Sequence, residues 1–189
     1  MNVNLKAVLF RAVPSLVRAA LSTTAAASMA PAWWRSRAVA PAAPGDAPGD
    51  VVSSPSEAAN ALLDRLAATF ELDLANLARI DDDGRRAWIA AARERGTDNT
   101  SLIGRSVALD QEPSGINTAV REGVAFTVYD AERSAVVNRR LNEIAKAKSC
   151  VFVPMRVDGR IVAVVFGAVR HARVFGDDEL AALQLLVDE

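Results

Sequence analysis

The first clear pattern along the chain is a set of apolar residues at helical spacing. They recur every three or four residues between positions 62 and 70, which places them on one face of a helix. The preceding residues 54–57 read Ser-Pro-Ser-Glu, a capping box with proline at the first helical position. We therefore expect a helix over about residues 55–70. Its buried face would contain Leu62, Leu63, Leu66 and Phe70.

Two extended runs follow this helix. Leu72–Ile80 and Arg86–Ala92 are joined by Asp-Asp-Asp-Gly at positions 81–84, in which Gly84 supplies a positive-φ position. These runs therefore predict a β-hairpin. Residues 96–104 are polar and only weakly patterned, and we expect a long loop there.

The middle of the chain predicts two more helices and a strand. Ser114 as N-cap and Gly123 just past the end frame a short helix over Ser114–Glu122. The run Val124–Tyr129 is typical of a strand. A further helix is expected over about Ser134–Ala147, because its apolar and basic residues fall on opposite sides.

The strongest local signal is a second hairpin. Residues 150–157 and 160–169 are extended apolar runs that flank Asp158-Gly159, the preferred chemistry of a two-residue turn. Neither run alternates between apolar and polar positions, so each strand must be covered on both faces. The hairpin is therefore expected at the centre of an antiparallel sheet, with helices on one face and either helices or a closed pocket on the other.

The last predicted element is a helix. Residues 176–179 read Gly-Asp-Asp-Glu, which is typical of a helix start, and leucines follow at helical spacing. The order of elements is then helix, hairpin, loop, short helix, strand, helix, hairpin and helix. This order indicates an α+β domain around a central antiparallel sheet.

Charge and composition separate residues 1–53 from residues 54–189. The 189 residues suffice for one ordinary domain plus a tail. The net charge of −1 is unevenly distributed. Positions 1–45 contain five basic residues and no acid, so the remaining residues carry a net charge of −6. Residues 38–50 consist almost wholly of Ala, Pro, Gly and Asp, which predicts disorder. We interpret 1–53 as a disordered basic tail.

The tail has two possible structured features. Residues 5–21 could form a short amphipathic helix interrupted near Pro14, and Trp33 and Trp34 could contact a membrane or a partner. A poorly ordered tail is the preferred interpretation. Basic residues interrupt any signal peptide, and the longest charge-free run is too short to span a membrane. We therefore expect a cytoplasmic protein.

The scarcity of Cys and His excludes several chemistries. The chain has one Cys and one His, so it cannot build a disulfide framework or a four-ligand Cys/His zinc site. A nucleophilic enzyme would have to depend on Cys150 or His171, and no set of acid, base and nucleophile can be assembled. We therefore expect no enzyme and no metal, and the modest basic clusters give no reason to expect nucleic-acid binding.

Several separated segments resemble the GAF domain family. The resemblance is carried by Ser149–Val164 (SCVFVPMRVDGRIVAV), Val174–Leu180 (VFGDDEL), Leu102–Gly104, Val120–Phe126 and Asp130. It covers about residues 56–187. It implies a sheet with helices on one face and, over the other, a small-molecule pocket roofed by loops and short helices.

Carried over by position, the resemblance also implies which residues line this pocket. They are Ser106, Val107, Phe126, Val128, Tyr129, Asp130, Asn138, Leu141, Asn142, Ser149, Cys150 and Phe152. From the residues alone, Asp130 serves equally well as a helix cap, and Cys150 in an apolar strand is expected to be an inert core thiol.

The expected function is that of a small-molecule sensor in signal transduction. The ligand and any cofactor remain open, but Cys150 is not followed by His, as is common in bilin-binding relatives. A single Cys also lacks the intramolecular disulfide of free methionine sulfoxide reductases. The family implies a homodimer, and output is expected through a partner protein. The alternative is a ligand-free scaffold that dimerises through its terminal helices.

Overall fold

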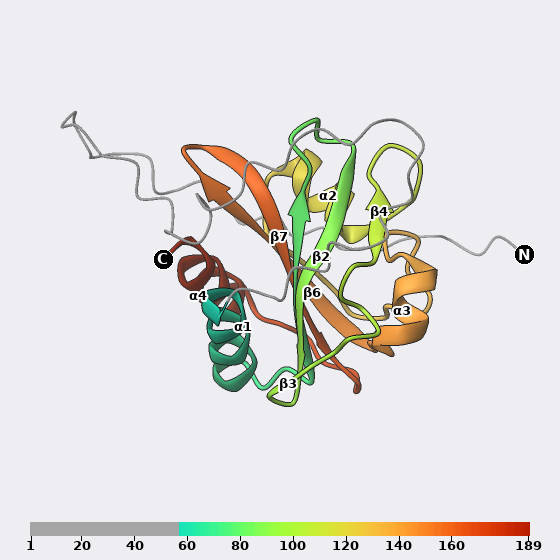
Figure 1. Cartoon of the computed structure of the whole chain (residues 1–189). Helices are drawn as coiled ribbons and strands as arrows, with labels where there is room; N and C mark the ends of the chain where they lie inside the picture. Colours follow the sequence, from blue (N-terminus) through green and yellow to red (C-terminus); the bar gives the residue numbers. More distant parts are fainter. Residues whose placement is uncertain (1–56) are drawn as a thin grey trace, which may run out of the picture.

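A computed structural model of the chain describes residues 57–189 (Figure 1). The predicted tail of residues 1–53, its amphipathic helix, its two tryptophans and the domain start at 54 all lie outside the described residues. The helix that the capping box predicts is observed as α1 (Glu57–Thr69), and its Leu63 and Leu66 are fully buried.

The described residues form four helices and seven strands. The helices after α1 are α2 (Gly115–Glu122), α3 (Arg139–Ala145) and α4 (Asp177–Asp188). The strands are β1 (Leu74–Ile80), β2 (Arg86–Glu94), β3 (Thr97–Asp98), β4 (Ser106–Ala108), β5 (Phe126–Val128), β6 (Ser149–Val157) and β7 (Arg160–Val169). Within residues 57–189, none of the helices is long and apolar enough to cross a membrane.

The seven strands form one antiparallel sheet in the order β3-β2-β1-β7-β6-β5, and β4 also pairs with β2. The β6–β7 hairpin therefore lies at the centre, as the doubly apolar runs predict. Its turn residues Asp158 and Gly159 have φ values of 51° and 79°, which is the backbone that Asp-Gly favours. The α+β fold with a central antiparallel sheet is thus confirmed.

Helices cover both faces of this sheet (Figure 1). The helices α1 and α4 pack side by side on one face, and α2 and α3 lie on the other. Alternate residues of β6 enter the two cores: Val151 and Val153 face α1 and α4, whereas Cys150 and Phe152 face α2 and α3. The second face is where the candidate site lies.

Two predicted segments differ from the structure. The helix expected over 134–147 is shorter, because Asn138 accepts the backbone N–H of Leu141 through its side chain and starts α3 only at Arg139. The loop expected over 96–104 contains the two-residue strand β3. Such a short strand has no alternating pattern to find, since only its pairing with β2 defines it.

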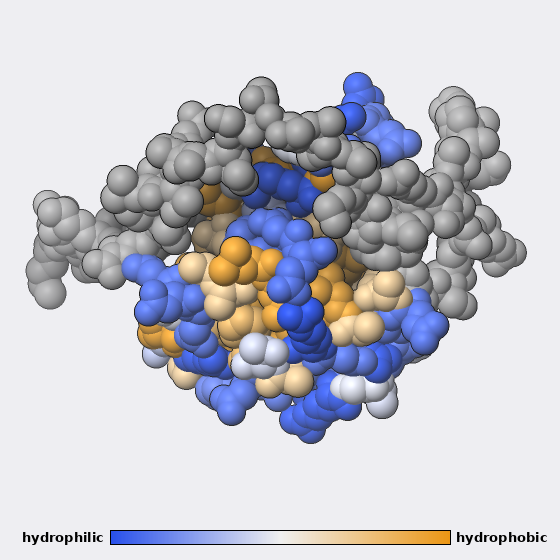
Figure 2. All heavy atoms as spheres, turned by 90° about the vertical axis from the view of Figure 1, so that its left-hand side faces the viewer, coloured by the Kyte–Doolittle hydropathy of each residue, from blue (hydrophilic) through white to orange (hydrophobic). Residues whose placement is uncertain are grey.

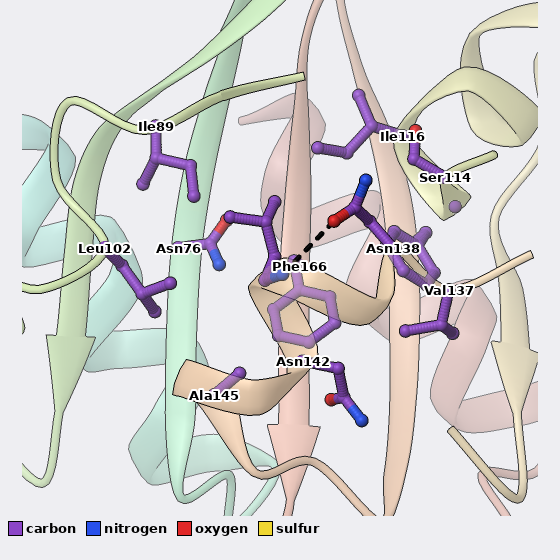
Figure 3. A pocket seen from close by; sticks show the side chains of 13 residues that line it. Asn76, Ile89, Leu102, Ser114, Ile116, Val137, Asn138, Asn142, Ala145 and Phe166 are labelled. Atoms are coloured by element: carbon purple, nitrogen blue, oxygen red, sulfur yellow. Dashed lines mark hydrogen bonds between the residues drawn. The ribbon is translucent and has the colours of Figure 1, made fainter. Parts of the chain in front are cut away.

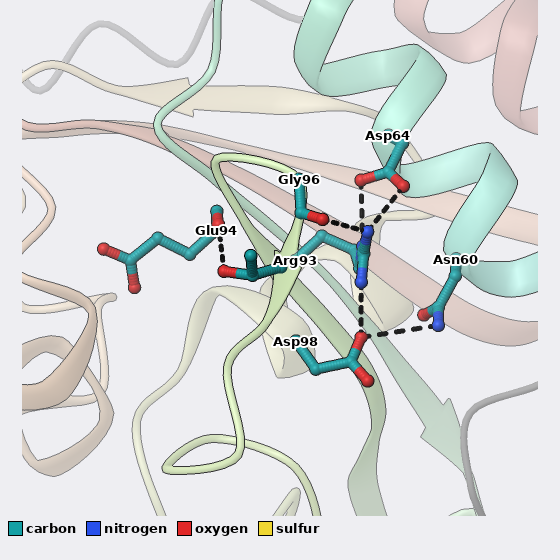
Figure 4. Close-up of polar contacts among 7 residues, drawn as sticks. Asn60, Asp64, Arg93, Glu94, Gly96 and Asp98 are labelled. Atoms are coloured by element: carbon teal, nitrogen blue, oxygen red, sulfur yellow. Dashed lines mark hydrogen bonds and ion pairs between the residues drawn. The ribbon is translucent and has the colours of Figure 1, made fainter.

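Arg93 connects α1 to the sheet (Figure 4). Its guanidinium donates to both carboxylate oxygens of Asp64 on α1, at 2.9 and 2.8 Å, and to Asp98 on β3. It also donates to the carbonyl of Gly96, and Asn60 of α1 donates to Asp98. The Arg93 side chain is only 14% exposed, so these bonds are partly shielded from water.

Arg93→Met is expected to lower the free energy of unfolding by about 1–2 kcal/mol, because it removes charge-assisted bonds to two carboxylates. The matched control is Arg65→Met, since the Arg65–Glu189 pair is more than half exposed on both sides. That control should change stability by less than about 0.5 kcal/mol. Urea denaturation measures both variants, and equal losses would show that the Arg93 network adds nothing beyond a surface pair.

Candidate functional site

A cavity of about 40 Å³ lies between the sheet and α3 (Figure 3). Its floor is formed by one residue from each of four strands, its side by the start of α2 and the loop before β4, and its roof by α3. A volume of this size holds a few water molecules. The lining residues are Asn76, Ile89, Leu102, Ser114, Gly115, Ile116, Val137, Asn138, Leu141, Asn142, Ala145, Phe152 and Phe166.

Three neighbouring aromatic rings support the floor of the cavity, with Phe152 stacked on Phe126 and tilted by 56° from Phe166. Phe152 lies between Phe126 and Phe166, with ring centroids 5.1 Å apart in both pairs. Gly115, at the first position of α2, lies directly against the Phe152 ring, since a Cβ atom there would overlap the ring atoms. Because Gly115 has no side chain, α2 can approach the sheet without displacing the Phe152 ring.

Asn76 is a polar side chain in the sheet floor. It lies in β1 between Ala92 of β2 and Phe166 of β7, and it is 5% exposed. Among the described residues, its buried Oδ1 atom has no hydrogen-bond partner. An unpaired buried polar atom costs about 1–3 kcal/mol, so packing alone does not account for an amide here.

The roof is held mainly by polar contacts. Only Ala145 of α3 is buried. Glu112 bridges to the start of α3 by accepting from Asn138 Nδ2 at 2.8 Å and from Arg140 at 3.4 Å. Arg140 also donates to the carbonyl of Ser106 in β4 at 2.8 Å. Leu141 and Ile144 pack against the core but are only partly buried, so this segment is expected to open more readily than the sheet.

The other end of the roof is closed by Asn142. Its Oδ1 accepts the N–H of Ala147 at 3.2 Å, and its Nδ2 donates to the carbonyl of the same residue at 3.3 Å. Asn142 and Val137 also line an open groove of about 460 Å³ on the outer side of α3. These two side chains therefore lie between the cavity and the outer groove, and their movement would widen the connection between the two spaces.

Acidification is expected to loosen the roof. The hydrogen bond from Asn138 is the main cause that lowers the pKa of Glu112 below its usual 4.5. Since the folded pKa is the lower one, the stabilisation is present above about pH 4.5 and is lost as the pH falls through the folded pKa. Amide protection factors of α3 should therefore fall below that pH.

In Glu112→Gln, the amide protection factors of α3 should already be low at neutral pH and should change little as the pH falls. Hydrogen exchange followed by NMR measures them. Glu143→Gln is the matched control, because Glu143 is an exposed acid on α3 itself. If Glu143→Gln abolishes the acid dependence and Glu112→Gln keeps it, the bridge does not hold the roof.

Four of the twelve residues predicted to line a pocket lie in the lining. They are Asn138, Leu141, Asn142 and Phe152. Three others belong to the same core without reaching the cavity: Val107, Phe126 and Cys150 are buried behind the lining. Val128 packs against this core from β5. Contact of any of them with a ligand stays a prediction.

The remaining four predicted residues lie outside the cavity. The Ser106 carbonyl accepts a hydrogen bond from Arg140. The Tyr129 side chain is largely in solvent, since the residue is 58% exposed. Asp130 forms ion pairs with Lys148 and Arg133. Ser149 is fully buried and structural, because its hydroxyl donates to the Tyr129 carbonyl at 2.6 Å and accepts the N–H of residue 173 at 2.9 Å. These side chains lie at the strand ends, away from the centre of the sheet.

The sequence contained a signal for Asn76 that the prediction missed. Within the run Leu74–Ile80, the positions that point to the cavity face carry Leu, Asn and Ala before Ile. A single amide among apolar neighbours on one strand face is unusual unless it has a partner. The other missed lining residues come from two further strands (Ile89 and Phe166), from the loop before β4 and from the ends of α2 and α3. Only the folded domain brings these distant segments together.

None of the thirteen lining side chains is charged. Cys150 lies behind them, and burial raises the pKa of its thiol to about 12, so it is a protonated core group. Within residues 57–189, no group of three or more His, Cys, Asp or Glu is placed to hold a metal ion. The lining therefore offers a bound molecule apolar contacts and hydrogen bonds to amide and hydroxyl groups.

Comparison with known proteins supports this geometry. The family described as "GAF domain" matches residues 52–189. No curated protein sequence matches the chain. The similar solved structures share the fold at low sequence identity.

One similar structure is the GAF domain/HD domain protein from Geobacter sulfurreducens, at 20% identity and a TM-score of 0.60 over 72% of this chain and 88% of that one. Another is a type II free methionine-R-sulfoxide reductase from Thermoplasma acidophilum, at 15% identity and a TM-score of 0.57 over 74% and 91%. A third is the GAF-B domain of DevS from Mycobacterium smegmatis, at 12% identity and a TM-score of 0.56 over 71% and 88%.

Proposed function

The chain belongs to the GAF domain family, and from this premise we propose that it is a regulatory domain that senses a small molecule. The ligand binds in the cavity between the sheet and α3, and its occupancy is transmitted to another protein. GAF domains are commonly sensory or regulatory modules, and the similar structures include a methyl-accepting chemotaxis protein and a domain described as that of a two-component sensor histidine kinase.

The observation that carries this proposal is the cavity itself. Its floor is a rigid sheet, whereas its roof is a seven-residue helix held by Glu112 and Asn142 through hydrogen bonds. A ligand larger than the 40 Å³ cavity would displace α3 and break these contacts. Binding and a change in the roof are then coupled, which is what a sensor requires.

The same lining argues against an enzyme. Catalysis needs a general acid, a general base or a nucleophile at the substrate, and the lining offers only amides, one hydroxyl and apolar groups. One similar structure is a sulfoxide reductase. This chain has one Cys, which is buried and protonated, so it cannot form an intramolecular disulfide. We therefore propose that the domain binds its ligand unchanged.

Thermal denaturation in the presence of a broad metabolite panel tests the proposal. A compound that binds the folded state raises Tm, and the rise grows with the logarithm of its concentration over Kd. Ala145→Leu, which adds a larger side chain to the cavity roof, should abolish that rise. Ala172→Leu, in the exposed loop after β7, is the matched control and should keep it. A rise that survives in Ala145→Leu would place binding elsewhere.

A homodimer is proposed as the second feature of function, supported by the outer surface of α1 and α4. Figure 2 shows apolar residues on both sides of a hydrophilic stripe on this face. Leu185 of α4 is 71% exposed, and Ala181 and Ala182 lie one turn before it. The exposed or half-buried apolar residues of this face are Ala58, Ala61, Leu62, Ala181, Ala182, Leu185 and Leu186.

Light scattering over a range of protein concentrations tests the dimer. Leu185→Glu should shift the mass to that of a monomer, because it places a charge in the middle of the shared apolar surface. Val124→Glu is the control, since Val124 is 39% exposed in the loop between α2 and β5. A dimer that Val124→Glu disrupts and Leu185→Glu leaves intact would place the interface on the other side of the domain.

A further inference from the structure

We propose that Asn76 orients the ligand, and that the ligand is a small uncharged molecule with an apolar body and one hydrogen-bond donor. This inference rests on the proposed function of the cavity as a binding site. It adds the chemical class of the ligand, which the fold and the family leave open.

The position of Asn76 carries the first step. Its side chain extends from β1 among the lining residues, in the middle of the sheet floor (Figure 3). The residue is 95% buried and its Oδ1 is an acceptor without a partner among the described residues. A ligand N–H or O–H at this atom would satisfy it, and the bond would form where water is largely excluded.

The other polar lining groups are already engaged. Asn138 uses its oxygen to cap α3 and its nitrogen on Glu112, and Asn142 uses both atoms on Ala147. Ser114 accepts the N–H of Asn117 as the N-cap of α2. Asn76 therefore provides the acceptor that is available without breaking the structure around the cavity.

The charge of the site excludes ionic ligands. No Lys, Arg, Asp or Glu side chain lines the cavity. Of the charged residues of α3, Arg140 pairs with Glu112 outside the lining, and Arg139 and Glu143 are exposed. An ion buried without a counter-charge loses several kcal/mol of hydration that nothing here repays. A phosphate, a carboxylate or an ammonium group is therefore not accommodated.

The apolar lining defines the body of the ligand. The rings of Phe152 and Phe166 form one wall, and Ile89, Leu102 and Ile116 form the others. A flat or compact apolar group would gain contacts with these side chains while its donor reaches Asn76.

Three probes of similar size separate these features: phenol has a donor, toluene has none, and benzoate is charged. Calorimetric titration should show phenol binding about tenfold more tightly than toluene, which corresponds to about 1.4 kcal/mol for one hydrogen bond. Benzoate should not bind. In the NMR spectrum, the side-chain amide of Asn76 should shift with phenol and much less with toluene.

Asn76→Leu removes the acceptor and keeps the volume. It should bind phenol and toluene equally, and without ligand it should melt higher than the wild type by about 3–5 °C, because an unpaired buried polar atom is gone. Leu141→Val is the control, as a lining substitution without a polar change, and it should keep the preference for phenol.

Several results would overturn the inference. One is that Asn76→Leu still prefers phenol to toluene. Another is that benzoate binds more tightly than phenol, and a third is that none of the three probes binds. Asn76→Leu melting well below the wild type would show that the amide is structural. If a panel metabolite stabilises the wild type and Asn76→Leu equally, the ligand class is wrong but the sensor remains. If no metabolite stabilises the wild type, the proposed function itself fails.

Discussion

Phe152→Ala is expected to lower the free energy of unfolding by about 3–5 kcal/mol, the range for truncating a buried aromatic ring. The ring is 4% exposed and lies between Phe126, on which it stacks, and Phe166, from which it is tilted. Its removal joins new space to the existing cavity, since Phe152 already lines it. The enlarged apolar cavity should then bind benzene, which would recover part of the lost stability.

Phe175→Ala is the matched control for this variant. Phe175 is equally buried at 4% exposure, but it belongs to the core on the α1 and α4 face. Urea denaturation with and without benzene should show a comparable loss in both variants and recovery in Phe152→Ala alone. Recovery of equal size in Phe175→Ala would mean that benzene fills any truncation and reports nothing about the cavity.

Gly115→Ala is expected to cost about 1–3 kcal/mol and to weaken ligand binding at least tenfold, because the added Cβ overlaps the Phe152 ring. The ring cannot turn aside freely, since Phe126 and Phe166 flank it. It must move along the floor and change the shape of the cavity. Thermal denaturation and calorimetric titration of a panel ligand would measure both effects.

A second substitution tests the cause of this loss. Gly115→Ala combined with Phe152→Leu should be more stable than the sum of the two single variants predicts, because the smaller side chain leaves room for the Cβ. Gly176→Ala is the control, since a Cβ there lies 3.9 Å from Glu179 and the φ is −76°. Strict additivity in the double variant would contradict the ring contact as the cause.

The sheet was predictable because its signals are local. The Asp158-Gly159 turn and the apolar runs beside it define the hairpin, and apolar residues on both strand faces place it at the centre. Ser114 and Gly123 define α2 in the same way: the side chain of Ser114 caps its start, and Gly123 ends it with a φ of 66°. In each case a few neighbouring residues decide the conformation.

The cavity was only partly predictable because it depends on contacts between distant segments. The resemblance to a family located the roof residues Asn138, Leu141 and Asn142, and it located Phe152 in the floor. It missed Asn76, because a single amide in an apolar run does not change the strand that the pattern predicts. It also placed Ser149 in the pocket, where the structure shows a hydroxyl that links the starts of two loops.

We expect the cavity beneath α3 to hold a small uncharged molecule. Native mass spectrometry can detect it on the full chain purified from its own cells, beside Ala145→Leu produced in the same cells. The wild type should carry a bound mass that leaves as a neutral species and that is missing from Ala145→Leu. A bound mass that leaves as an anion, or one that Ala145→Leu retains in full, would contradict it.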